Sequence, residues 1–156
     1  MPYREMTKWL VDGARGRMVD WIQRLPVEQW DQPGPDGGWT MKDFVGHFTY
    51  WNEVCCDMLE PVRDGLPPKP WPMSDEEGLH RLNADDLARR RGESVESLWS
   101  DFETSMARVQ DLIEALPDDA FELGADPLSI IASNTFGHWP EHMAQLRKLV
   151  RHLQSS

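Results

Sequence analysis

The chain of 156 residues has few cysteines, and it has no long hydrophobic run. Its two cysteines, Cys55 and Cys56, are adjacent, and adjacent cysteines rarely pair because the disulfide strains the peptide between them. We therefore expect two reduced thiols packed inside a helix. No apolar segment approaches the roughly 20 residues of a membrane-spanning helix. The N-terminal segment MPYREMTKWL lacks the apolar stretch of a signal peptide. These absences predict a cytoplasmic protein without a membrane partner.

Basic residues are also scarce. There are 16 Lys and Arg against 27 Asp and Glu, which gives a formal net charge of −11. Nucleic acids and anionic membranes bind clustered cations, so this balance argues against both as main partners. The one basic run, residues 89–91, is interpreted as part of a solvated connector. A hydrophobic content of 40% with eight tryptophans excludes a disordered chain, and the length predicts a single domain over residues 1–156.

Apolar residues recur at helical spacing through most of the chain, and no segment alternates apolar and polar residues over the length of a strand. Four stretches show apolar residues at helical spacing: about residues 7–25, 40–60, 94–116 and 126–153. Trp9 is assigned to the apolar side of the first stretch. A polar connector follows the second stretch, and its residues 74–91 are expected to form a helix over the bundle. The pattern predicts an all-α four-helix bundle with a long polar connector between helices 2 and 3.

Local signals mark where these helices begin. Thr40 is a natural N-cap, and Asp43 three residues later completes an approximate capping box. Ser94 is the candidate N-cap of the third helix, while Asp126 and Pro127 are expected as N-cap and first residue of the fourth.

One histidine lies inside the second predicted helix. At about 100° per residue, His47 shares a face with the apolar residues Phe44, Trp51, Val54 and Met58. This face is expected to point into the core. A histidine there is either a hydrogen-bonded core residue or a metal ligand.

Two further histidines, His138 and His142, are four residues apart in the fourth stretch. That spacing places both imidazoles on one helix face, where one ion can bind both. The same face carries Asn134, so the pair is also expected to point inward. Asn134 and Trp51 are candidates for lining a pocket near the three histidines.

Together the three imidazoles form a candidate metal site of the kind that helical bundles build from facing helices. Three protein ligands leave positions open for water and substrate, and neutral imidazole suits Zn, Ni, Cu or Fe(II). No HExxH motif is present, which argues against a peptidase. The residues leave a structural alternative open, in which all three histidines are core hydrogen-bond partners.

Pro140 lies between the paired histidines and complicates their geometry. Inside a helix, proline removes one hydrogen bond and clashes with the preceding turn. Two outcomes are open: the fourth helix kinks at Pro140, or it begins near Pro140 and leaves His138 outside the helical register.

Two segments resemble a known family. GWTMKDFVGHFTYWNE looks like the second-helix signature of the DinB/YfiT-like superfamily, and NTFGHWPEHMAQLRKL resembles its last-helix signature. The segment LHRLNADDLARRRGESVESLWSDFETSMARVQDLIEALPDD is similar to the connector and third helix of the ClbS/DfsB branch. The resemblance spans about residues 9–153.

The resemblance implies a four-helix bundle that holds a divalent metal, usually Zn or Ni, on three histidines. These map onto His47, His138 and His142. Many members form homodimers, and their known activities include thiol-dependent transfer with bacillithiol, mycothiol or glutathione. The ClbS/DfsB branch includes a hydrolase that destroys a genotoxin.

The leading hypothesis is therefore a metal-dependent hydrolase or thiol S-transferase that acts on a small electrophile, in detoxification or stress protection. The alternative is a non-catalytic bundle that binds a small molecule or toxin.

Overall fold

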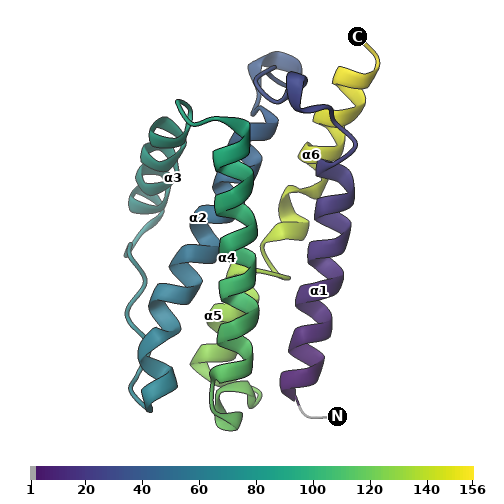
Figure 1. Ribbon diagram of the computed structural model, residues 1–156. Coiled ribbons are helices and arrows are strands. Elements are labelled where there is room, and N and C mark those ends of the chain that lie inside the picture. Colours follow the sequence, from purple (N-terminus) through teal and green to yellow (C-terminus); the bar gives the residue numbers. More distant parts are fainter. Residues whose placement is uncertain (1–2) are drawn as a thin grey trace.

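The computed structural model describes residues 3–156, and every regular element in that range is a helix (Figure 1). The six α-helices are α1 (Tyr3–Ile22), α2 (Met41–Leu59), α3 (Glu76–Arg90), α4 (Val95–Ala115), α5 (Asp126–Asn134) and α6 (Trp139–Gln154). Four short 3₁₀ turns connect them: η1 (Val27–Gln29), η2 (Pro35–Gly37), η3 (Glu60–Asp64) and η4 (Asp118–Phe121). The predicted all-α class is confirmed.

The four long helices α1, α2, α4 and α6 lie side by side as a bundle (Figure 1). In this view α1 and α6 run upward while α2 and α4 run downward. The segment between α2 and α4 returns along the outside of the bundle and contains α3, as the sequence predicts. The fourth predicted stretch is split into the short helix α5 and the longer helix α6.

The predicted caps determine where α2 and α4 begin. The Thr40 hydroxyl accepts a hydrogen bond from the Asp43 backbone N–H at 3.1 Å, and the Asp43 carboxylate accepts one from the Thr40 N–H at 3.1 Å. Ser94 caps α4 by accepting from the Ser97 N–H at 3.1 Å. The prediction for α5 is wrong by one residue, since Ala125 occupies the N-cap position and Asp126 the first helical position.

Both cysteines are buried and free in the core, as expected. Burial, as the largest cause, raises the pKa of the Cys56 thiol to about 12 and the pKa of Cys55 well above its usual value. These thiols therefore stay protonated, and packing is their role.

The assignment of Trp9 to the core is wrong, because its side chain is 72% exposed. The buried stripe of α1 contains Val11, Ala14, Met18 and Ile22, spaced by three or four residues. Trp9 precedes Val11 by two residues, so it lies about 200° around the helix, on the opposite face.

The interpretation of the basic run as wholly solvated is also wrong. Arg90 at the end of α3 is only 4% exposed, and its guanidinium donates to Asp86 at 3.0 Å and to Glu53 at 3.0 Å. The physical reason is Gly46 on α2, where a Cβ would lie 2.9 Å from Arg90 Cδ. The missing side chain lets Arg90 lie flat on α2, while Arg89 is exposed as expected.

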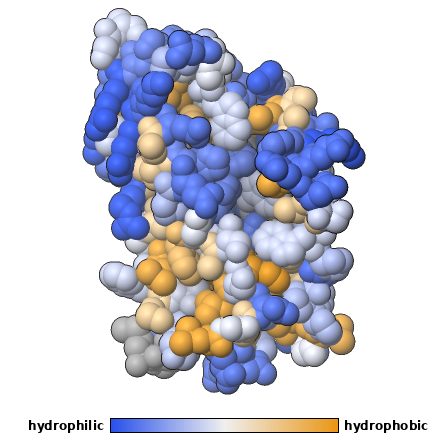
Figure 2. Space-filling view, turned by 180° about the vertical axis from the view of Figure 1, so that it is seen from behind, coloured by the Kyte–Doolittle hydropathy of each residue, from blue (hydrophilic) through white to orange (hydrophobic). Residues whose placement is uncertain are grey.

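Hydrophobic side chains gather in the lower half of the face seen in Figure 2, whereas hydrophilic side chains cover most of its upper half. Tyr3, Met6 and Trp9 on α1 are among the exposed hydrophobic residues. Within residues 3–156, no helix has the length and apolar character needed to cross a bilayer.

Candidate metal centre

The first histidine is held in the second turn of α2. The capping box at Thr40 sets the start of the helix, so His47 follows two turns later on the face that packs inward. His47 is 4% exposed and lies among the rings of Trp39 and Phe48. Asp43, one turn before His47, is engaged in the cap, and no hydrogen bond joins it to the imidazole in the described chain.

The second histidine lies in the break between α5 and α6. The helix ends at Asn134, and the carbonyl of Thr135 accepts from the backbone N–H groups of His138 at 2.9 Å and Trp139 at 2.8 Å. Pro140 is then in the first turn of α6, where its missing N–H costs nothing. Of the two outcomes left open by the sequence, the structure has the second: a new helix begins beside Pro140.

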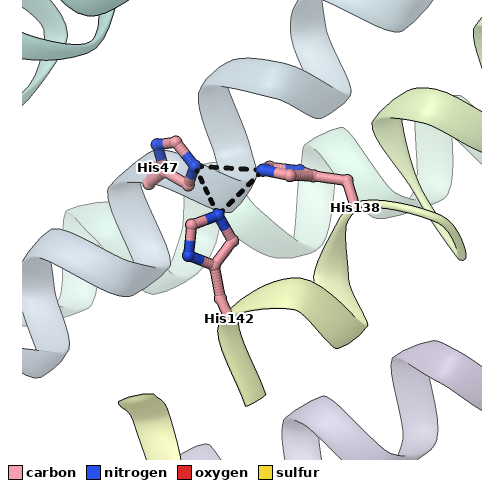
Figure 3. A group of neighbouring side chains, drawn as sticks. All are labelled: His47, His138 and His142. Atoms are coloured by element: carbon pink, nitrogen blue, oxygen red, sulfur yellow. Dashed lines mark hydrogen bonds between the residues drawn. The ribbon is translucent and has the colours of Figure 1, made fainter. Parts of the chain in front are cut away.

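Despite this break, the predicted histidines come together. The Nε2 atom of His47 lies 3.1 Å from that of His138 and 3.2 Å from that of His142, and the latter two atoms are 3.1 Å apart. Figure 3 shows the three ring edges pointing at one another: His47 comes from α2, His138 from the break before α6 and His142 from the first turn of α6. Within residues 3–156 these form the group of side chains that could hold a metal ion.

The distances fit a shared ion. Nitrogens that are each about 2.0–2.1 Å from one zinc ion lie roughly 3 Å from one another, close to the spacing here. A neutral imidazole carries only one N–H, so three converging Nε2 atoms cannot all satisfy each other as hydrogen-bond partners. A cation at their meeting point would satisfy all three lone pairs.

The surroundings keep the imidazoles neutral, as metal ligation requires. Burial is the main cause and the neighbouring imidazoles add to it, which lowers the pKa of His47 to about 2. Burial and His142 lower the pKa of His138 to about 4, against a smaller opposing effect of the Asn134 backbone. Burial also lowers the pKa of His142.

Gln145 orients the third ring. Its Oε1 atom lies 3.3 Å from Nδ1 of His142, and an amide oxygen can only accept a hydrogen bond. Nδ1 therefore carries the proton, and Nε2 is left with a free lone pair facing the other two histidines.

A cavity of about 420 Å³ opens beside the triad. His142 forms part of its wall, together with Trp39, Phe44, Gln145 and Lys148. The sequence reasoning missed Trp39, whose indole stacks on His142 with ring centroids 5.7 Å apart and an angle of 17° between the planes. The sequence signal that could have identified Trp39 is a hydrophobic staple. Trp39 directly precedes the N-cap of α2 and packs on Phe44 at the fourth helical position.

The two pocket candidates lie close to the triad but do not line this cavity. The Trp51 ring is 6.4 Å from that of His138, and its indole N–H donates to Asn83 on α3 at 2.9 Å. Asn134 is buried and its amide donates to the Ile130 carbonyl at 2.8 Å. A ligand contact of either residue stays a prediction.

Comparisons with known proteins agree with this fold. A family model described as the DinB superfamily matches residues 10–154. No curated protein matches the chain. A similar solved structure is the crystal structure of an uncharacterised protein from Escherichia coli UTI89, with a TM-score of 0.80 and 18% sequence identity. The alignment covers 99% of this chain and 96% of that chain, and at this identity it shows the fold alone.

Proposed function

The chain belongs to the DinB superfamily, and from that premise we propose that it is a metal-dependent enzyme acting on a small electrophilic molecule. The observation that carries the proposal is the convergence of three neutral imidazoles, with their Nε2 atoms 3.1 to 3.2 Å apart, beside a cavity. Zinc or nickel is the proposed ion, because both accept imidazole nitrogen.

His47, His138 and His142 would hold the ion. A divalent ion with open positions lowers the pKa of a bound water or thiol, so that a nucleophile is available near neutral pH. The chain contributes the geometry: α2 positions His47, Gln145 sets the tautomer of His142, and Trp39 stacks on the His142 ring.

Hydrolysis and thiol transfer differ only in which nucleophile enters the open position. The similarity of residues 79–119 to the ClbS/DfsB branch favours a protective reaction, in which a reactive small molecule is destroyed by water or by a thiol such as glutathione, bacillithiol or mycothiol. We extend the proposal to that role in detoxification.

The test is turnover of epoxides and alkyl halides by zinc- or nickel-loaded protein, with and without added thiol, followed by mass spectrometry of the products. We expect turnover that His47→Ala abolishes and that His152→Ala, an exposed histidine on α6, leaves intact. Turnover only with thiol identifies a transferase, and turnover without it identifies a hydrolase.

The alternative is a non-catalytic protein that binds a small molecule in the cavity beside Trp39. It predicts stoichiometric binding of an electrophile without product, and binding that survives His47→Ala. That result would contradict the enzyme proposal.

A further inference from the structure

The cavity beside the triad has one strongly charged wall residue. Most of its lining is apolar or uncharged, while Lys148 supplies an ammonium group. The His142 ring is the part of the triad that borders the cavity. A molecule bound here would therefore touch the triad at one side and a cation at another.

Lys148 is also free of an internal partner. No acidic group of residues 3–156 lies within ion-pair distance of it, although ten other basic residues in that range form such pairs: Arg4, Lys8, Arg24, Lys42, Arg63, Arg81, Arg89, Arg90, Arg91 and Arg108. In a chain of net charge −11, an unpaired ammonium at a cavity wall is available for an anion supplied by a ligand.

The remaining walls are flat and apolar. Trp39 is only partly buried, and its indole stacks nearly parallel on the His142 ring. Phe44 and Leu149 add apolar surface. At Gly34 and Gly38 the wall carries no side chain, so a ligand can lie against the backbone there. Aromatic faces of this kind favour planar apolar groups.

We propose that this cavity binds small planar apolar molecules that carry one carboxylate, with the carboxylate at Lys148 and the apolar body against Trp39. The inference rests on the proposed function, because it narrows the electrophiles proposed for this site to those with a planar apolar body and one carboxylate. Lys148 determines specificity and does not touch the metal-ligating nitrogens.

The test uses two probes of equal shape, 2-naphthoate and 2-naphthamide, titrated calorimetrically into protein kept metal-free with a chelator. Without metal, the carboxylate cannot bind an ion at the triad. We expect 2-naphthoate to bind roughly fivefold more tightly than the amide, the upper end for an exposed charge pair, and less so at high salt. Lys148→Gln should remove this difference, and Trp39→Leu should weaken both probes.

Lys69→Gln is the matched control, because Lys69 is also an exposed lysine without an ion pair in the described range and lies outside the cavity. It should leave both affinities unchanged. Equal affinity of the two probes, equal effects of the two lysine substitutions, or no binding of either probe would overturn the proposal.

Failure of this inference is distinguishable from failure of the proposed function. Binding of 2-naphthoate that requires zinc and is indifferent to Lys148→Gln would overturn the role of Lys148 and leave the metal centre intact. Conversely, absence of any metal on the triad would contradict the proposed function, while the titrations without metal would still test Lys148.

Discussion

His47 is buried, and His138 and His142 are partly buried, which disfavours the protonated form of each imidazole. A buried histidine loses hydration in its protonated form, so its pKa falls, and a neighbouring imidazole lowers it further. The pKa of His47 falls to about 2 and that of His138 to about 4, so protons do not compete with a metal ion near neutral pH.

The same shifts predict how the stability of metal-free protein depends on pH. An unfolded histidine has a pKa of about 6.5, so below that pH the unfolded chain binds protons that folded His47 and His138 exclude. Their contribution to stability is fully present above pH 6.5 and is lost as the pH falls toward 4. Between these pH values, each of the two histidines lowers the free energy of unfolding by about 1.4 kcal/mol per pH unit.

Urea unfolding in a chelator between pH 7 and 4 measures this loss. His138→Gln should reduce the slope of stability against pH by the contribution of one histidine, whereas His152→Gln, at an exposed position on α6, should leave it unchanged. Identical slopes in wild type and His138→Gln would show that His138 is not buried in neutral form.

Gln145 provides a second prediction at this scale. Because its Oε1 accepts from Nδ1 of His142, Gln145→Met removes the group that fixes the tautomer and orientation of that ring. We expect zinc affinity, measured by competition with a chromophoric chelator, to fall about tenfold, the low end for such partners. Gln32→Met, at an exposed position outside the cavity, is the control and should have no effect.

At this scale the sequence predicted the ligands but not their supporting residues. Helical spacing placed His47 on an inward face and paired His138 with His142, while the resemblance to the superfamily implied that all three are metal ligands. His138 in fact lies just before α6, so its place beside His142 does not come from one continuous helix. Gln145 lies on the same face as the pair, yet its contact with Nδ1 depends on a rotamer that spacing does not specify. Trp39 lies outside any helix, where periodicity has no meaning.

The break between α5 and α6 is the element that assembles the site. The chain turns sharply after Asn134, and the Gly137 N–H donates to the Ala132 carbonyl at 2.8 Å. A Cβ at Gly137 would lie 2.6 Å from that carbonyl oxygen, which is too close for any side chain. Glycine is therefore required for the turn that delivers His138 to the triad.

Gly137→Ala should disrupt this turn. The added Cβ would clash with the Ala132 carbonyl oxygen, and we expect a loss of about 1–3 kcal/mol in unfolding free energy, together with loss of zinc binding in the fraction that stays folded. Gly16→Ala is the matched control, because a Cβ there meets nothing within 4 Å and alanine favours the helix interior. Circular dichroism and zinc titration separate the two effects. Unchanged zinc affinity in folded Gly137→Ala protein would contradict the role of the turn.

Pro140 allowed either a kinked helix or a new helix start, and sequence could not decide between them. Proline is tolerated in the first turn of a helix and destabilises a helix interior. A proline at this position is therefore compatible with a kink in one helix and with the start of a new one. The decision depends on the close contact between Gly137 and Ala132 and on the Thr135 carbonyl, which are tertiary details of the turn.

Over the whole molecule, Arg90 joins α3 to the bundle, and a buried ion pair within α3 holds its guanidinium in place. Asp86 and Arg90 on α3 are both buried, and Arg90 also binds Glu53 on α2. This contact lies one residue from His47, since Arg90 packs on Gly46. The connector that sequence described as polar and solvated therefore helps to hold the helix that carries the first ligand.

Removing the carboxylate that pairs with Arg90 inside α3 should lower the stability of the fold. Asp86→Asn leaves the buried guanidinium with only the partly exposed carboxylates of Glu53 and Asp101, and we expect a loss of about 3 kcal/mol in unfolding free energy. Glu77→Gln on the same helix breaks only an exposed pair with Arg81 and should cost less than about 0.5 kcal/mol. Urea unfolding compares the two, and equal losses would contradict a structural role for the buried pair.

The bundle class and the inward faces were predictable because apolar periodicity covers most of the chain. Trp9 was misplaced because a tryptophan at helical spacing was taken as core, although it lies opposite the stripe of Val11 and Met18. A homodimer stays a prediction, and the exposed side chains of Tyr3, Met6 and Trp9 on α1 are apolar surface available to one.

The most direct test of the metal centre is elemental analysis of protein purified without a histidine tag. We predict near-stoichiometric zinc, nickel or another divalent transition metal, lost in His47→Ala and His142→Ala and retained in His152→Ala. Protein that contains no such metal and takes none up when it is supplied, or metal that survives both triad substitutions, would contradict a three-histidine metal site.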